Sequence, residues 1–114
     1  MVLKKISYID DIVYGVTSLL EKPAEPKENW DKVFDASRSS SPYAIYNIGN
    51  NDPVKLGKFI SIIEDILDMK ARKEFHDMQP GDIKETFANI DELSDLVGYK
   101  PRTSLEEGLK KFIY

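Results

Sequence analysis

The sequence predicts a mixed α/β fold, a small domain with about three short strands and four or five helices. Its 114 residues fit one domain with a single modest core. Two long runs space their apolar residues three and four apart, as on one face of a helix. Between these runs, residues 43–48 have the aromatic and β-branched content of a strand. We therefore treat residues 1–114 as a single unit.

A short strand and an amphipathic helix are expected first. Lys4 to Tyr8 is the strand candidate. Apolar residues at helical spacing then predict the helix: Ile9, Ile12, Val13, Val16, Leu19 and Leu20. Pro23 ends it, because proline cannot continue the helical hydrogen-bond ladder. Residues 22–42 are rich in proline and serine and have no sustained periodicity, so we expect a long loop excursion there.

The second helix is predicted after a glycine turn. Gly49 and the two asparagines that follow it suit a sharp turn after the strand at residues 43–48. We expect Asp52 to cap the helix and Pro53 to take its first position, where no backbone donor is required. The helix carries the most regular apolar stripe of the sequence: Leu56, Phe59, Ile60, Ile63, Ile66 and Leu67.

Two short helices are expected at the end of the chain. Before them, Ala71 to Phe75 is a weaker strand candidate, and residues 78–82, MQPGD, have the composition of a turn. Asn89 and Ser104 are each followed three residues later by an acid, which is the pattern of a helix N-terminus. Gly98 ends the first of these helices.

Composition excludes several classes of protein. The formal net charge of −4 argues against a nucleic-acid partner, which needs a basic face. No apolar stretch is long enough to span a membrane. The absence of cysteine excludes disulfides and thiolate chemistry. We expect a cytoplasmic location.

The sequence contains no clear reaction centre, so we predict no catalytic and no metal-ligating residue. Asp10 and Asp11 are interpreted as structural, because carboxylates in a first helical turn favourably meet the helix dipole. His76 is the only histidine, and we expect it at the surface. Trp30 and Phe34 either pack over a small core or line a ligand-facing flap, and we favour packing.

The expected catalytic and cofactor signatures of a dehydrogenase are also missing. Gly49 stands without the closely spaced glycines that let a backbone approach a pyrophosphate. None of the six tyrosines has a lysine four positions later. The strand–turn–helix unit at residues 43–67 therefore does not bind a dinucleotide by any recognisable fingerprint.

Four separated motifs nevertheless carry a family resemblance: SYIDDIVYGV, YAIYNIGNNDPVKLGKFISIIEDIL, MQPGDIKETFANIDEL and VGYKPRTSLEEGLKKFI. In their order and spacing they resemble the carboxy-terminal part of extended short-chain dehydrogenase/reductase (SDR) nucleotide-sugar epimerases. The likeness is greatest to the bacterial UDP-glucuronate 4-epimerases of capsule and polysaccharide biosynthesis. These isomerases have a Rossmann-type domain with an NAD site and a tyrosine–lysine catalytic pair, which this sequence lacks.

The resemblance implies a substrate-binding role for this chain. It implies that the chain is not catalytic and holds no cofactor alone, and that NAD belongs to the full-length enzyme. The YNIG segment is then expected to complete the sheet of an amino-terminal Rossmann domain. The remaining residues resemble the small domain that closes over a UDP-sugar substrate.

Two substrate-binding residues follow from the resemblance, Gln79 and Lys4. Gln79 stands where many relatives have an arginine that contacts the nucleotide diphosphate, and its amide can donate hydrogen bonds but supplies no charge. The other reading of Gln79 is turn structure. Lys4 stands where relatives often have an arginine, whose planar fork lysine lacks. Asp82 is expected to fix the turn after Gly81.

A second hypothesis is a stand-alone binding or dimerisation module derived from such an enzyme. An exposed YNIG edge would pair with another chain and give a homodimer. The choice of sugar nucleotide and of epimerised carbon stays open, because decarboxylase and dehydratase relatives share much of this region. An independent hydrolase or metalloenzyme has no positive signal in the sequence.

Overall fold

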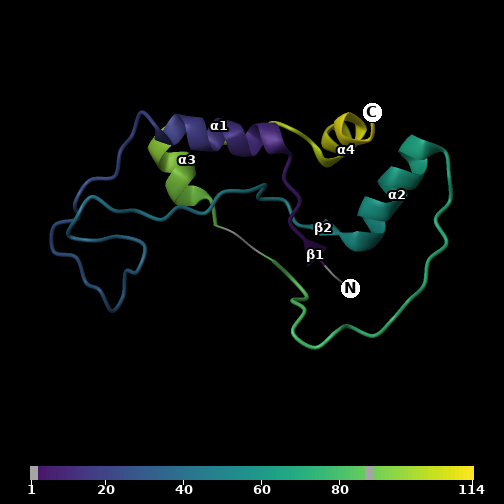
Figure 1. The fold of residues 1–114 in the computed structure, drawn as a ribbon, viewed down its shortest axis with the longest axis horizontal. Helices are drawn as coiled ribbons and strands as arrows, with labels where there is room; N and C mark the ends of the chain where they lie inside the picture. The colour runs from purple at the N-terminus through teal and green to yellow at the C-terminus, as the bar shows by residue number, and fades with distance from the viewer. Residues whose placement is uncertain (1–2, 87–88) are drawn as a thin grey trace.

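A computed structural model describes residues 3–86 and 89–114. In chain order its elements are β1 (Leu3–Lys4), α1 (Ile9–Leu19), β2 (Val54–Lys55), α2 (Leu56–Leu67), α3 (Asp91–Val97) and α4 (Leu105–Ile113). Helices α1 and α3 lie at one end of the molecule and α2 and α4 at the other, with the short strands between them (Figure 1). Long segments without helix or strand loop out from both ends. The mixed α/β class is confirmed.

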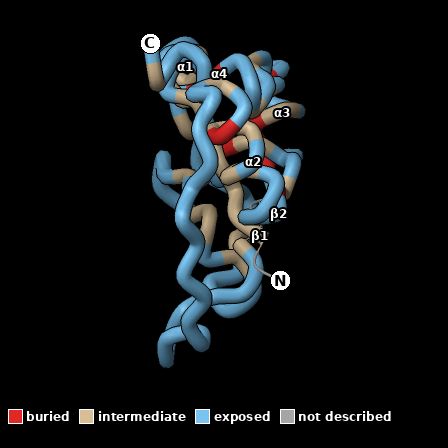
Figure 2. The backbone as a smooth tube through the Cα atoms, turned by 90° about the vertical axis from the view of Figure 1, so that its right-hand side faces the viewer, coloured by how far each residue is buried: buried red, intermediate tan, exposed pale blue. Residues whose placement is uncertain are grey.

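The molecule is a thin slab. Its extents are 56 × 33 × 15 Å and its radius of gyration is 18.1 Å, whereas a compact chain of this length has about 13 Å. The side view in Figure 2 shows most of the backbone exposed and only short buried stretches near the helices. The 15 Å depth leaves room for little more than one layer of structure.

Strand β1 joins segments that are distant in the sequence. It pairs antiparallel with β2, with Leu3 opposite Lys55 and Lys4 opposite Val54. On its other side, Leu3 forms a parallel bridge with Glu85 and its N–H donates to the carbonyl of Lys84 at 3.0 Å. The predicted first strand is therefore present but begins one residue earlier and ends at Lys4. Its pairing brings residues 83–86 beside the start of the chain.

The hydrophobic core lies between α1, α3 and the residues after α3. Ile90, Leu93 and Tyr99 form it, and all three are buried. The Tyr99 hydroxyl donates to the Gly49 carbonyl at 3.3 Å. Gly15 lets α1 approach closely, because a Cβ there would overlap Ile48 and lie 3.0 Å from the Tyr99 ring. This end of the molecule is closed by its own side chains.

The predicted strand at residues 43–48 is not formed. Within the described residues this segment makes one isolated bridge, Arg38 with Ala44, and Ile45 donates to the Ser37 carbonyl at 2.9 Å. A strand needs a neighbour along its whole length, and this segment has none here. The weaker candidate at 71–75 is not a strand either, for the same reason.

The start of the second helix also differs from the prediction. Val54 and Lys55 pair with β1, which keeps their backbone extended, so α2 begins at Leu56 with Lys55 as its N-cap residue. Asp52 and Pro53 therefore do not cap or open this helix. The apolar run from Leu56 to Leu67 is helical throughout, as predicted.

The end of α1, the end of α3 and the start of α4 agree with the sequence signals, whereas α3 begins at Asp91 with Ile90, and not Asn89, as its N-cap residue. Helix α1 ends at Leu19, before Pro23. The Asn89 side chain accepts from the Asp91 N–H at 2.8 Å, and Gly98 ends α3 in the left-handed region at φ 66°. Ser104 caps α4 by accepting from the Glu107 N–H at 3.2 Å.

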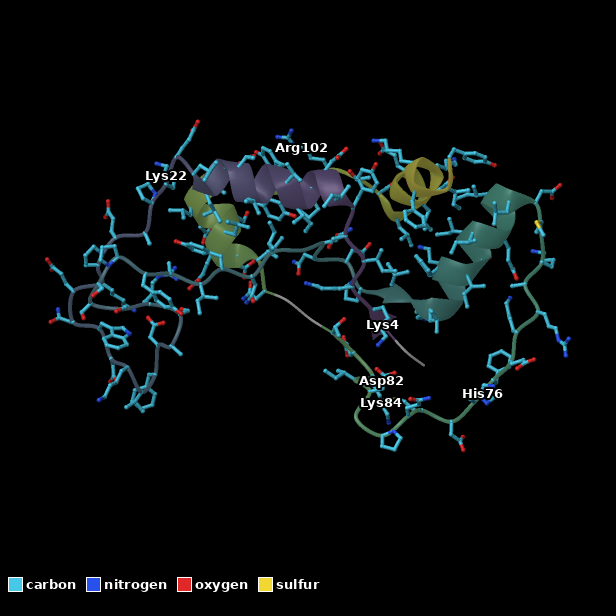
Figure 3. The ribbon with its side chains drawn as sticks, in the orientation of Figure 1. Lys4, Lys22, His76, Asp82, Lys84 and Arg102 are labelled. Carbon is cyan, nitrogen blue, oxygen red and sulfur yellow. The ribbon has the colours of Figure 1, made fainter. Side chains whose placement is uncertain are left out.

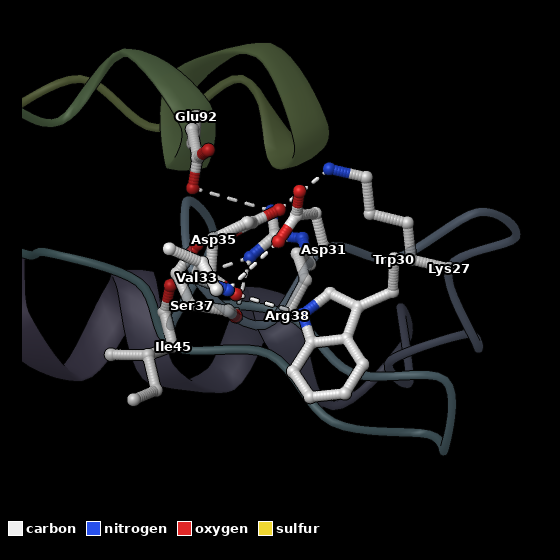
Figure 4. A network of polar contacts seen from close by, with 9 residues as sticks. All are labelled: Lys27, Trp30, Asp31, Val33, Asp35, Ser37, Arg38, Ile45 and Glu92. Atoms are coloured by element: carbon white, nitrogen blue, oxygen red, sulfur yellow. Dashed lines mark hydrogen bonds and ion pairs between the residues drawn. The ribbon is translucent and has the colours of Figure 1, made fainter.

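Residues 22–42 have no helix, and their contacts are mainly polar. Figure 4 shows the Trp30 indole donating to the Asp35 carbonyl at 2.8 Å, and Arg38 pairing with Glu92 of α3 at 3.2 Å. Trp30 is half-buried, but Phe34 is 88% exposed. The expected packing of Phe34 is therefore wrong, because this loop is held by hydrogen bonds and ion pairs instead of a small apolar core.

Candidate functional site

Lys4 extends from β1 toward the MQPGD turn. Its ammonium lies 3.3 Å from the Asp82 carboxylate and 3.3 Å from the Ile83 carbonyl (Figure 3). The backbone pairing of Leu3 with residues 84 and 85 fixes this approach. The structure thus brings the first predicted site residue to the turn that carries the second.

Gln79 begins that turn. Its carbonyl accepts from the Asp82 N–H at 3.1 Å, and Gly81 has a φ of 89°, which favours glycine. The Asp82 carboxylate accepts from the Ile83 N–H at 2.9 Å, so Asp82 fixes the turn as predicted. Gln79 itself is exposed, like every other residue from 68 to 85. Its side-chain amide is therefore accessible to a ligand.

The charge of Lys4 is partly neutralised where it lies. The Lys4 and Asp82 side chains are 36% and 49% exposed, and ion pairs at such surfaces contribute about 0–1 kcal/mol. A phosphate would compete with Asp82 for the ammonium at little cost. Next to Lys4, partial burial lowers the pKa of Lys5 below its usual value.

Asp11 is buried and has a specific structural role. Its carboxylate accepts from the backbone N–H groups of Arg102 and Thr103, each at 3.1 Å, and from the Thr103 hydroxyl at 3.3 Å. It thereby ties α1 to the connector before α4. The structural interpretation holds, but the helix dipole is not its main cause. No local pattern predicts this contact, because the partners are more than 90 residues apart.

The turn at Gly49 is held by contacts within the chain. The Gly49 carbonyl accepts from Tyr99, and the Asn50 N–H donates to the Ser7 hydroxyl at 3.0 Å. A backbone amide already engaged in this way is not aimed at a pyrophosphate. Burial, followed by the charge of Asp11, raises the pKa of Tyr99, so this tyrosine is poorly suited to act as a base.

An apolar cavity of about 350 Å³ opens between α2, α4 and residues 6–8. No signal in the sequence predicts this cavity, which we call the α2–α4 cavity. Its lining contains no charged residue and neither Lys4 nor Gln79: Ile6, Ser7, Tyr8, Asn50, Phe59, Ile63, Thr103, Ser104, Leu105, Gly108, Leu109, Phe112 and Ile113. Such walls suit apolar side chains and offer nothing to neutralise a diphosphate.

Two further features bear on function. Among the described residues, no group of three or more metal-binding side chains comes together, and His76 is 81% exposed at 3.8 Å from Glu74. None of the helices in the described ranges has the length and apolarity needed to cross a membrane.

The fold is that of the carboxy-terminal part of Rossmann-type extended SDR epimerases. The structure matches that of UDP-glucuronic acid 4-epimerase from Bacillus cereus, solved in complex with UDP-glucuronic acid and NAD, with a TM-score of 0.71 and 27% identity. The match covers 99% of this chain and 33% of the Bacillus protein.

Sequence comparison finds similar proteins over nearly the whole chain. The chain is 43% identical to Protein CapI of Staphylococcus aureus over 112 residues, which is 97% of this chain and 34% of CapI. It is 39% identical to UDP-glucuronate 4-epimerase 1 of Arabidopsis thaliana over 111 residues, 96% of this chain and 25% of that enzyme. No protein-family model matches the chain. The chain is therefore similar, over nearly all of its length, to the carboxy-terminal part of UDP-glucuronate 4-epimerases, and it spans a quarter to a third of their length.

Proposed function

We propose that this chain is the substrate-binding, carboxy-terminal portion of an NAD-dependent UDP-glucuronate-type epimerase and is not catalytic alone. The observation that carries this proposal is the similarity over 97% of the chain to CapI and over 99% to a structure that holds UDP-glucuronic acid and NAD. We place the activity in polysaccharide biosynthesis and in the cytoplasm.

Lys4 and Gln79 are the groups that would contact the nucleotide diphosphate. Both are accessible, and Lys4 lies against the turn that Gln79 begins. The Lys4 ammonium supplies one positive charge, and the Gln79 amide supplies hydrogen-bond donors. One lysine already paired with Asp82 gives weak binding, so the UDP-sugar needs contacts from the amino-terminal Rossmann domain as well.

NAD would be held by that amino-terminal domain. The turn at Gly49 supports this division, because its Asn50 N–H is engaged by Ser7 and its Gly49 carbonyl by Tyr99. NAD supplies hydride transfer when it is bound. The part of this chain is to bind and orient the sugar nucleotide.

Ligand-observed NMR with UDP-glucuronate and with UDP tests the proposal. We expect saturation transfer to the ligands only when this chain is mixed with a separately expressed, NAD-loaded amino-terminal domain of a relative. Lys4→Ala and Gln79→Ala should each weaken binding several-fold. Lys22→Ala is the matched control, since Lys22 is an exposed lysine that lies far from Lys4 and Asp82 (Figure 3).

Tight UDP-sugar binding or turnover by this chain alone would contradict the proposal. If the Lys4→Ala and Lys22→Ala variants bound UDP-glucuronate equally well, Lys4 would not be a substrate-binding residue.

A second candidate function is a dimerisation module that uses residues 43–48. Tyr43 and Ile45 are 46% and 51% exposed on this segment, which has no strand partner among residues 3–86 and 89–114 beyond its one bridge. Light scattering at increasing concentration tests it. A dimer that is lost in the Ile45→Pro variant supports the dimerisation function. A chain that stays monomeric at all concentrations contradicts it.

A further inference from the structure

Lys84 follows the MQPGD turn by two residues and is fixed beside β1. The Leu3 N–H donates to the Lys84 carbonyl at 3.0 Å, and Leu3 forms a parallel bridge with the next residue, Glu85. This pairing holds the backbone of Lys84 against the strand that carries Lys4. From the sequence, only Lys4 and Gln79 are expected to bind substrate, so the structure brings a further lysine to their site.

Lys4 and Lys84 lie close together, although they are distant in the sequence. The Lys4 ammonium lies 3.3 Å from the Ile83 carbonyl oxygen, which belongs to the peptide bond that joins Ile83 to Lys84. The Cα atom of Lys84 is therefore within about 6 Å of that ammonium. Figure 3 shows Lys4, Asp82 and Lys84 next to one another where β1 meets the turn. The fold thus gathers two cationic side chains in one place.

The positive charge of Lys84 has no partner within the described part of the chain. Lys84 is exposed, and its ammonium makes no hydrogen bond or ion pair with residues 3–86 or 89–114. Lys4 pairs with Asp82, whereas Glu85 makes no ion pair with either lysine. The Lys4–Asp82 pair has no net charge, so Lys84 supplies the available positive charge beside the turn. An anion that approaches Lys4 is therefore attracted by Lys84 as well.

We infer that Lys84 is a further substrate-binding residue, which contacts the nucleotide diphosphate together with Lys4 and Gln79. This inference rests on the proposed function. A lysine binds phosphate as a point charge, and Lys84 can do so without breaking an existing ion pair. When the diphosphate replaces Asp82 as the partner of Lys4, Asp82 keeps its hydrogen bond from the Ile83 N–H, so the turn stays closed.

The diphosphate suits this cluster better than the carboxylate of the sugar does. A carboxylate has two oxygen atoms that accept hydrogen bonds. A diphosphate has more acceptor oxygens and carries more negative charge, so it can accept from several donors at once. Two ammonium groups and the Gln79 amide offer such a set of donors on one side of the turn.

Ligand-observed NMR with UDP and with UDP-glucuronate tests the inference on this chain mixed with the NAD-loaded amino-terminal part of the Staphylococcus aureus relative. Lys84→Ala should weaken the binding of both ligands about three- to fivefold, as expected for one exposed ion pair. Lys84→Glu should weaken it more than about tenfold, because repulsion replaces attraction. Lys84→Arg keeps the charge and should bind like the wild type. Lys22→Ala is the matched control, since Lys22 is exposed and lies far from Lys84 (Figure 3).

The dependence of binding on salt separates a ligand contact from a structural role. The affinity of the wild type for UDP should fall as the salt concentration rises. It should fall less steeply in the Lys84→Ala variant, which has one charge fewer at the site. Equal affinities of the Lys84→Ala and Lys22→Ala variants overturn the inference. A loss confined to UDP-glucuronate also overturns it, because Lys84 would then contact the carboxylate of the sugar.

Inorganic pyrophosphate, titrated into this chain alone and followed by amide chemical shifts, distinguishes the two proposals. Shifts at residues 83–85 that are lost in the Lys84→Ala variant support the anion contact, even if the mixed chains do not bind UDP-glucuronate. That combination contradicts the proposed function alone. If the mixed chains bind UDP-glucuronate, but pyrophosphate leaves residues 83–85 unshifted and Lys84→Ala binds like Lys22→Ala, the proposed function stands and the role of Lys84 is refuted.

Discussion

The two ends of the molecule differ in how completely this chain fills them. At the α1–α3 end, Leu93 is 1% exposed and Tyr99 is fully buried. At the α2–α4 end there is a 350 Å³ apolar cavity, and Phe112 is 83% exposed. Helix α2 buries a single residue, the carboxylate of Glu64, although it carries the most regular apolar stripe. The core between α1 and α3 is thus closed by side chains of this chain, whereas apolar side chains between α2 and α4 stay open to solvent.

The largest effect is expected from the same substitution made at the two ends. Leu93→Ala should lower the free energy of unfolding by about 2–5 kcal/mol, because it opens a cavity in a closed core. Leu105→Ala should cost less than about 2 kcal/mol, since Leu105 is half-buried and already lines a cavity. Urea denaturation measures both. Equal costs at the two sites would show that the two ends are equally packed.

The close approach at Gly15 comes next. Gly15→Ala should destabilise the chain by about 1–3 kcal/mol, because the added methyl group overlaps Ile48 and crowds Tyr99. Gly57→Ala is the control at the other end, where a Cβ meets nothing within 4 Å, and it should be stabilising or neutral. Thermal unfolding of both variants checks this. A neutral Gly15→Ala variant would mean that α1 is free to shift outward.

The Asp11 contact has an expected effect of similar size. Asp11→Ala leaves the N–H groups of Arg102 and Thr103 without their acceptor and should cost about 1–3 kcal/mol. Asp10→Ala, which removes an exposed carboxylate from the same helical turn, should change stability by less than about 1 kcal/mol. Chemical denaturation distinguishes the two. If both variants lost the same free energy of unfolding, Asp11 would stabilise the chain only through the helix dipole.

The smallest effect concerns acid. The hydrogen bond from Lys73, and then that from the Ala71 N–H, lowers the pKa of Glu64. A depressed carboxyl pKa stabilises the fold above the ordinary value of 4.5, and this contribution disappears as the pH falls through the folded-state pKa. In the Glu64→Gln variant, the free energy of unfolding should therefore fall less steeply as the pH is lowered. Unfolding curves from pH 3 to 7, compared with Asp65→Asn at a neighbouring exposed carboxylate, measure the difference.

Local signals in the sequence predicted the helices well. The spacing of apolar residues located α1 and α2. The cap at Ser104 located the start of α4, and Gly98 located the end of α3. Those features depend on contacts within a few residues, so they can be predicted from the sequence alone. The strand at residues 43–48 was predicted wrongly, because strand propensity is realised only when a second strand is present to pair with.

The candidate site was predicted in part. Lys4 and Gln79 came from a family resemblance, and the structure adds that β1 pairing brings Lys4 to the turn of Gln79. Asp11 and its partners could not be found from the sequence, because a carboxylate in a first helical turn looks the same whether it faces solvent or a connector 91 residues away.

The sequence by itself determined where the helices form, where they end and which of their residues are apolar, because helix spacing and capping are local properties. Only the tertiary structure decided which face of α1 the chain buries. That choice depends on the close packing of Gly15 and the long-range hydrogen bonds of Asp11, which turn the face with these two residues inward and leave Ile9, Val13, Val16 and Leu20 exposed.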